Sequence, residues 1–234
     1  MMASKIGNYL SAALVLIFYA EPVAAIVIDD FSVGPITVER TGVDPGMAEQ
    51  LGLNPTNVIG GVRSISVGSS GSPIQTLEIQ AEESQLVFET GPHANTFIGY
   101  FDISYGSTSL PLNIDLTANG ANAFLLEYET NLDRVPLARV IVSSPSGTDN
   151  PAFSNFDTQP LPGGRTRIVL PFDRYPRVDF ENVTQISLDV ARFPSASQIT
   201  FYRFETVPEP TTAMLIVASL MSFAIQHRSR VAQN

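Results

Sequence analysis

The chain has no cysteine and no tryptophan among its 234 residues. Without cysteine it can form no disulfide, no thiolate metal site and no cysteine nucleophile. Without tryptophan, tyrosine and phenylalanine must supply any aromatic contact to a ligand. His93 is the sole histidine outside the C-terminal tail. Zinc binding and histidine-based catalysis therefore have little support in this sequence.

Basic residues are scarce, and Lys5 is the only lysine. Between residues 26 and 207 the chain carries 21 acidic residues and 10 arginines, a net charge near −11. Such a body disfavours nucleic acid and anionic lipid as partners, because both present phosphates. A local group of four arginines either contacts an anionic polysaccharide or balances the neighbouring Asp173 and Asp179: Arg165, Arg167, Arg174 and Arg177.

Residues 1–25 have the three parts of a secretory signal peptide. Lys5 supplies the positive charge, Tyr9 to Ala20 form the apolar region, and Val23-Ala24-Ala25 is a small-residue cleavage site. The apolar run is short for a permanent membrane anchor, which is the alternative interpretation. We therefore expect export of the protein and a mature N-terminus near Ile26.

The last thirty residues also fall into three parts. Pro208, Glu209 and Pro210 hold the backbone extended, because proline excludes a helix there. The uncharged apolar segment 211–225 predicts a helix, and the arginines at 228 and 230 mark its cytoplasmic end. Such a helix rises about 22 Å against roughly 30 Å of hydrocarbon, which is short for a permanent anchor. It has almost no polar face, so we expect a transmembrane helix and not a buried core helix.

This order of motif, apolar span and arginine-containing tail resembles the PEP-CTERM sorting signal of exported bacterial proteins, over residues 207–230. The resemblance implies a protein held in the inner membrane until an exosortase cleaves near the motif. The product is then released or attached to the cell surface, usually in bacteria that make exopolysaccharide. The resemblance is silent on residues 26–206.

That body, residues 26–206, consists of short stretches that alternate apolar and polar residues. About a dozen such stretches at 8–12-residue spacing predict a two-layer antiparallel β-sandwich. Residues 41–57 are instead typical of a loop, with at most one helical turn at 47–51. The clearest alternation predicts a strand with three residues in the core and two facing water: Ile186, Leu188 and Val190 inward, Ser187 and Asp189 outward.

Four segments together resemble galactose-binding-like jelly rolls, a more specific fold class: IDDF at 28–31, GGVR at 60–63, LNIDL at 112–116 and DFENVTQI at 179–186. The resemblance implies that the first and last strands of the body pair. It also implies a structural calcium ion near those strands, with Asp29, Asp30 and Glu205 as oxygen ligands. The alternative is that these are charged edge residues that discourage aggregation.

Carbohydrate binding would need an aromatic platform beside side chains that hydrogen-bond hydroxyl groups. Tyrosines with one wet end are equally normal at the strand edges of a sandwich, but they are the candidates: Tyr100, Tyr105, Tyr128 and Tyr175, with Tyr202 a fifth. Catalysis has less support, because there is no G-x-S-x-G motif. Glu127 and Glu129 are spaced for glycoside hydrolysis, but their alternation with apolar residues also marks the polar side of a half-buried strand.

Together these observations predict a non-enzymatic surface or extracellular-matrix protein that acts as a carbohydrate-interaction or adhesion module. The expected partners are an exosortase and, for the body, exopolysaccharide or another glycan. A structural matrix component without a ligand is the alternative. A polysaccharide-active enzyme is the less favoured one.

Overall fold

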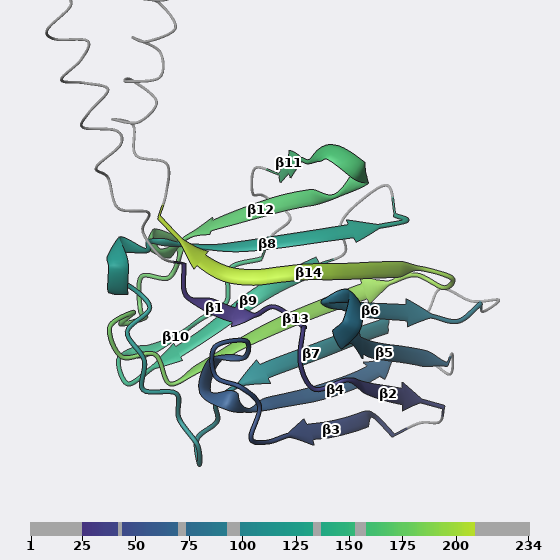
Figure 1. Cartoon of the computed structure of the whole chain (residues 1–234), viewed down its shortest axis with the longest axis horizontal. Coiled ribbons are helices and arrows are strands. Elements are labelled where there is room, and N and C mark those ends of the chain that lie inside the picture. The colour runs from purple at the N-terminus through teal and green to yellow at the C-terminus, as the bar shows by residue number, and fades with distance from the viewer. Residues whose placement is uncertain are drawn as a thin grey trace, which may run out of the picture.

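The computed structural model describes residues 25–41, 44–69, 74–92, 99–132, 137–152 and 158–208. Within these ranges the chain forms two antiparallel sheets packed face to face (Figure 1). Sheet A has eight strands: β1 (Val27–Asp29), β2 (Ile36–Arg40), β5 (Gln75–Gln80), β6 (Gln85–Thr90), β8 (Ala123–Thr130), β11 (Thr158–Pro160), β12 (Thr166–Pro171) and β14 (Gln198–Val207). Sheet B has six: β3 (Gly46–Gln50), β4 (Arg63–Ser69), β7 (Gly99–Tyr105), β9 (Leu137–Ser144), β10 (Gly147–Asp149) and β13 (Gln185–Phe193).

Short 3-10 turns join some of these strands: η1 (Ile59–Gly61), η2 (Ala81–Glu83), η3 (Ala118–Gly120), η5 (Pro162–Gly164) and η6 (Phe172–Arg174). The order in sheet A is β11-β12-β8-β14-β6-β5-β2, with β1 also paired to β14, and the order in sheet B is β10-β9-β13-β7-β4-β3. The pairings are nested: β6 with β14, β7 with β13, β8 with β12, and β9 with β10. Nested pairing of eight strands across two sheets is a jelly roll, so the predicted antiparallel β-sandwich is confirmed.

Strand β13 shows why the sequence forms this sandwich. Ile186, Leu188 and Val190 are all 0% exposed between the sheets, as the alternation predicts. Ser187 and Asp189 lie on the outer face of sheet B. Ser187 does not face open water, however, because its hydroxyl lies 2.7 Å from that of a serine on β7 and its side chain is buried. The expectation of a solvent-facing Ser187 is wrong.

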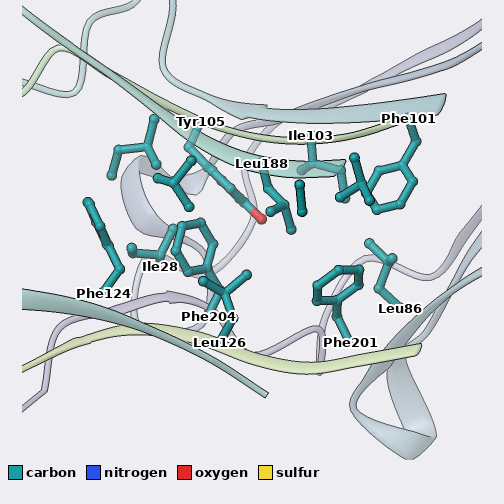
Figure 2. Close-up of a cluster of buried hydrophobic side chains, with 14 of the residues drawn as sticks. Ile28, Leu86, Phe101, Ile103, Tyr105, Phe124, Leu126, Leu188, Phe201 and Phe204 are labelled. Atoms are coloured by element: carbon teal, nitrogen blue, oxygen red, sulfur yellow. The ribbon is translucent and has the colours of Figure 1, made fainter. Parts of the chain in front are cut away.

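The core between the sheets is rich in aromatic rings. Figure 2 shows side chains from β7 and β13 facing those from β6, β8 and β14. Phe88 lies with its ring centroid 4.9 Å from that of Phe101 and 4.8 Å from that of Phe193. Rings of this size bury large apolar areas, which stabilises a sandwich that has no disulfide.

Strand β3 corrects another expectation. Residues 46–50 form a strand against β4, where we expected a loop with one helical turn. This strand lies at the edge of sheet B, and its Met47 side chain is 73% exposed. An edge strand packs fewer side chains into the core, so its sequence need not show a strong apolar alternation.

Both ends of the described body leave from one corner of the sandwich. Strand β1 pairs with the last residues of β14, which confirms the predicted pairing of first and last strands. The Ile26 N–H donates to Thr206 Oγ1 at 3.2 Å, and the Thr206 N–H donates to the Ile26 carbonyl at 2.9 Å. The Asn122 N–H donates to the Val207 carbonyl at 3.1 Å, and Pro208 is the next residue after Val207.

The structure does not describe most of the predicted sorting elements. Residues 1–24 and 209–234, which include Glu209, Pro210 and the predicted helix 211–225, lie outside the described residues. In the ranges that the structure does describe, no helix is long and apolar enough to cross a membrane.

Candidate functional site

The ring of Tyr100 lies flat on the backbone of Gly68 on the outer face of sheet B. The two residues are opposite each other on β7 and β4. A Cβ placed on Gly68 would lie 2.2 Å from both Cζ and Oη of Tyr100 and 2.8 Å from Cε1. These three distances can be met together only from beneath the face of the ring. Tyr100 is 38% exposed, so the opposite face of its ring is open to solvent.

A glycine is needed at position 68 because the tyrosine ring leaves no room for a side chain, and not because of the backbone conformation. It lies within β4 and has no positive φ, so an alanine could adopt the same conformation. Only the space under the tyrosine ring excludes a side chain. The pair thus forms a planar aromatic platform fixed to the surface of the sheet.

Hydrogen-bonding side chains continue the same face away from this platform. Ser66 and Asp102 lie opposite each other, each two residues from the Gly68–Tyr100 pair and about 7 Å along the strands. Ser104 Oγ donates to Asp102 Oδ1 at 2.6 Å. A carboxylate and a hydroxyl group therefore lie about 7 Å along the strands from the aromatic platform.

Asp102 lies opposite a second carboxylate, Asp189 of β13. Like charges in this position repel, and Arg139 of β9 offsets the repulsion through an ion pair with Asp189. Burial raises the pKa of Asp102 and the charge of Asp189 raises it further, while the hydrogen bond from Ser104 lowers it. A half-buried carboxylate has lost part of its hydration, so it is a strong acceptor for hydroxyl groups of a ligand.

A cleft of about 470 Å³ borders this line of polar groups. Strands β3, β4 and β7 line it with a mixture of apolar and polar groups: Met47, Ala48, Glu49, Ser64, Ile65, Ser66 and Asp102. Ser66 and Asp102 belong to both the cleft and the polar line, so the cleft continues from the platform. Its volume falls within the usual range for small-molecule sites of about 300–1,000 Å³.

The other three predicted tyrosines are not available to a ligand, and that part of the carbohydrate-site prediction is wrong. Tyr105, Tyr128 and Tyr175 are at most 2% exposed, because each faces the core. Tyr105 points between the sheets (Figure 2), where its hydroxyl donates to Asp29 Oδ2 at 2.8 Å. Tyr175 packs edge-on against Phe180, and burial raises its pKa.

The predicted calcium ligands do not come together. Asp29 lies between the sheets and accepts a bidentate pair of hydrogen bonds from Arg63, at 2.6 and 2.7 Å. Asp30 instead accepts hydrogen bonds from Ser32 and Asn57 at the surface. Glu205 lies on the outer face of sheet A, next to a different arginine.

The charge that calcium would supply is already present beside Asp29. Arg63 and Asp29 are both 0% exposed, and burial raises the pKa of Asp29 despite the arginine. In the part of the chain that the structure describes, no group of three histidine, aspartate or glutamate side chains could hold a metal ion. These residues therefore do not fit a calcium site, and the ion pair explains why the acidic residue is buried.

Other residues singled out in the sequence have structural roles. Glu127 forms an ion pair with Arg167, and Glu129 accepts a hydrogen bond from the Tyr202 hydroxyl at 3.0 Å. Arg177 pairs with Asp149, which is not one of the aspartates expected to balance the arginines. His93 lies outside the described residues.

The platform itself could be found only in part from the sequence. Tyr100 was a candidate, and the alternation of Tyr100, Asp102 and Ser104 with apolar residues places all three on one face. Gly68, however, lies in a distant segment, and the sequence does not reveal the register that sets it beneath the ring. Ser66 was missed for the same reason, whereas Asp102 lies on the strand of Tyr100 and was not singled out although the alternation places it on the same face.

No family model and no curated protein matches this chain. Solved structures with a similar arrangement of strands include the family 11 carbohydrate-binding module of a cellulosomal cellulase of Clostridium thermocellum, at 11% identity and a TM-score of 0.37, covering 80% of this chain and 96% of that one. The family 30 carbohydrate-binding module of another cellulosomal cellulase of Clostridium thermocellum matches at 13% identity and a TM-score of 0.36, covering 80% and 98%.

A family 12 xyloglucanase from Bacillus licheniformis is also similar, at 10% identity and a TM-score of 0.42, covering 74% of this chain and 99% of that one. Binding modules and an enzyme thus both occur among these neighbours. With TM-scores below 0.5, the function has to be argued from the residues of this chain.

Proposed function

We propose that the outer face of sheet B binds a neutral carbohydrate, with Tyr100 as the stacking platform. The observation that carries this proposal is the ring of Tyr100 lying face down on Gly68 with its other face open. A sugar ring has an apolar face of C–H groups and an edge of hydroxyls. An exposed aromatic face beside hydrogen-bonding groups is complementary to both.

In this proposal each group has a distinct task. Tyr100 contacts the C–H face of one sugar ring, while Asp102 and Ser66 hydrogen-bond the hydroxyls of that ring or the next. The cleft beside β3 holds the next sugar units of the bound glycan. Asp102 and Glu49 make this part of the face acidic, while Arg139 offsets the charge of Asp189, so a neutral polymer is favoured over one that carries carboxylates or sulfates.

We further propose that the module works as an exported surface or matrix protein. The support is the signal-like segment at 1–25, the PEP-CTERM-like segment at 207–230, and the short junction between fold and motif. Val207 is still hydrogen-bonded within the sandwich and Pro208 follows it, so no linker would separate the sandwich from the sorting segment at 207–230. An exosortase acting near the motif would then release or transfer an intact sandwich that adheres to exopolysaccharide.

Glycoside hydrolysis is the second candidate function. Asp102 and Asp189 face each other on neighbouring strands, where Cβ atoms are about 4.5–5.5 Å apart. A retaining glycosidase needs two carboxyl groups at about 5–5.5 Å, one of them with a raised pKa. The ion pair between Arg139 and Asp189 favours the binding function, because it ties up the carboxylate that would have to act as nucleophile.

A glycan array tests the proposal. The exported protein is applied to neutral and acidic glycans beside two variants, Tyr100→Ala and Thr148→Ala. Thr148 is exposed on β10 at the far edge of the same sheet and serves as the control. We expect neutral glycans to be bound by the wild type and the control and lost by Tyr100→Ala. Binding that survives Tyr100→Ala overturns the proposal, and shortened glycan products would favour hydrolysis.

A further inference from the structure

The outer face of sheet A carries a second depression, a trough of about 410 Å³. Four strands line it almost entirely with amide, hydroxyl and carboxylate groups: Thr76, Glu78, Gln80, Gln85, Val87, Glu89, Glu129, Thr130, Asn131, Gln198, Thr200 and Tyr202. Among the lining residues that the structure describes, Val87 is the one purely apolar member, and none is a lysine or an arginine. The lining suits a ligand rich in hydroxyl groups and repels an anionic one.

Hydrogen bonds between the lining side chains of the trough fix their positions before any ligand binds. Gln198 Nε2 donates to Glu89 Oε1 at 2.6 Å, and Gln80 Nε2 donates to Glu78 Oε2 at 2.7 Å. A carboxylate has about four lone-pair sites, so each of these glutamates keeps capacity to accept hydroxyl groups. Preorganised acceptors bind with a smaller loss of side-chain entropy than mobile ones.

Tyr202, which lines the trough, is stacked against an arginine outside it. The Arg165 guanidinium carbon lies 3.6 Å from the centroid of the Tyr202 ring, and the Tyr202 hydroxyl donates to Glu129 Oε2. Burial raises the pKa of Tyr202, and the hydrogen bond to Glu129 and its charge raise it further. The hydroxyl therefore stays protonated at neutral pH, and the guanidinium covers one face of the ring. This site recognises its ligand through hydrogen bonds more than through an open aromatic face.

The trough and the Tyr100 platform lie back to back at the same end of the sandwich. Gly99, which precedes Tyr100, lies so close to Gln75 and Thr90 that an added Cβ would be 2.6 and 3.0 Å from their side chains. Gln75 and Thr90 are the immediate neighbours of the trough residues Thr76 and Glu89. The trough includes residues 198–202 of β14. The two ends of the described body come together at Thr206 and Val207, roughly 13–30 Å further along the same strand.

We infer that the trough is a second binding site for neutral, hydroxyl-rich glycan, which makes the sandwich bivalent. This inference rests on the proposed carbohydrate binding at Tyr100. Two sites on opposite faces cannot hold one short oligosaccharide, so each takes its own chain. The protein would then join two polysaccharide strands, at the end of the sandwich that points away from the sorting segment.

The test measures stoichiometry and cross-linking with three probes: hexasaccharides of β-1,4-linked glucose, of mannose and of galactose, each with its parent polymer. Equilibrium dialysis of the exported protein should give two hexasaccharides bound per chain. Tyr100→Ala and the double variant Glu89→Ala/Gln198→Ala should each give one, and the three substitutions combined none. Gln159→Ala on β11, at the far edge of sheet A, is a matched control that should keep two.

With the polymer, the wild type should raise the viscosity of the solution, while each single-site form should bind the polymer without raising it. One hexasaccharide per chain in both the wild type and the Glu89→Ala/Gln198→Ala form overturns the second site and leaves Tyr100 binding intact. Binding that Tyr100→Ala leaves unchanged and the double variant abolishes overturns the platform and bivalency together. If no probe binds the wild type, bivalency toward neutral glycan is overturned.

Discussion

Tyr100 covers Gly68 so closely that a single added carbon atom would lie 2.2 Å from the ring. Gly68→Ala should therefore lift or rotate the ring while leaving the tyrosine in place. Because the backbone there is ordinary extended strand, the free energy of unfolding should change by less than about 1 kcal/mol. We expect glycan binding to fall as far as in Tyr100→Ala, measured by titration calorimetry beside urea unfolding. Wild-type affinity in a folded Gly68→Ala protein would show that a flat ring is not needed.

The buried pair of Asp29 and Arg63 gives a prediction on stability. Arg63→Met should leave the Asp29 carboxylate buried without its counter-charge and lower the free energy of unfolding by about 3–5 kcal/mol. Asp29→Asn with Arg63→Met should cost less than Arg63→Met alone, because the unpaired charge is removed with its partner. Urea unfolding of the two forms measures the difference. Equal losses in both would mean that packing, and not charge, is what Arg63 contributes.

The pH dependence of stability tests the environment of Asp102. Its pKa is raised in the folded protein, so the folded state binds this proton more tightly than the unfolded state does. Stability from this group is fully present below the unfolded pKa of about 3.9 and is lost as pH rises through the folded pKa. Asp102→Asn should therefore unfold at higher urea than the wild type at pH 7 and at similar urea near pH 3. A variant that is less stable than the wild type at pH 7 would contradict this.

The processing prediction concerns the motif after the last strand. If Pro208, Glu209 and Pro210 direct cleavage, Pro208→Ala/Pro210→Ala protein should remain in the membrane fraction of its native host. The fold should be unaffected, because the sandwich ends at Val207. Fractionation and blotting measure the distribution, with mass spectrometry of the exported wild type expected to find Ile26 at the N-terminus. Normal release of the variant would show that the motif has no part in processing.

The sequence predicted strands correctly where apolar and polar residues alternate strongly. It failed for a strand whose burial depends on its position at the edge of the sheet. Ile186, Leu188 and Val190 point inward as their spacing requires, because a period of two admits only one buried face. Strand β3 at residues 46–50 was missed, because an edge strand need not bury an apolar row.

The site was less predictable than the fold. Tyr100 and Tyr105 both lie on β7, but an odd number of positions separates them, so they point to opposite faces. Tyr105 shares its face with Phe101 and Ile103, which is the signal that it belongs to the core. The contact with Gly68 and the trough on sheet A depend on strand register, and long-range packing sets that register.

The stacking role of Tyr100 is tested most directly by titration calorimetry of three proteins with the tightest-binding neutral glycan. These are the wild type, Tyr100→Phe and Tyr100→Ala. Phenylalanine keeps the ring and removes only the hydroxyl, so its Kd should stay within about threefold of the wild type. Alanine removes the platform, so its Kd should rise at least about tenfold, or 1.4 kcal/mol. Equal losses in both variants, or an alanine variant that binds like the wild type, would contradict binding by stacking on Tyr100.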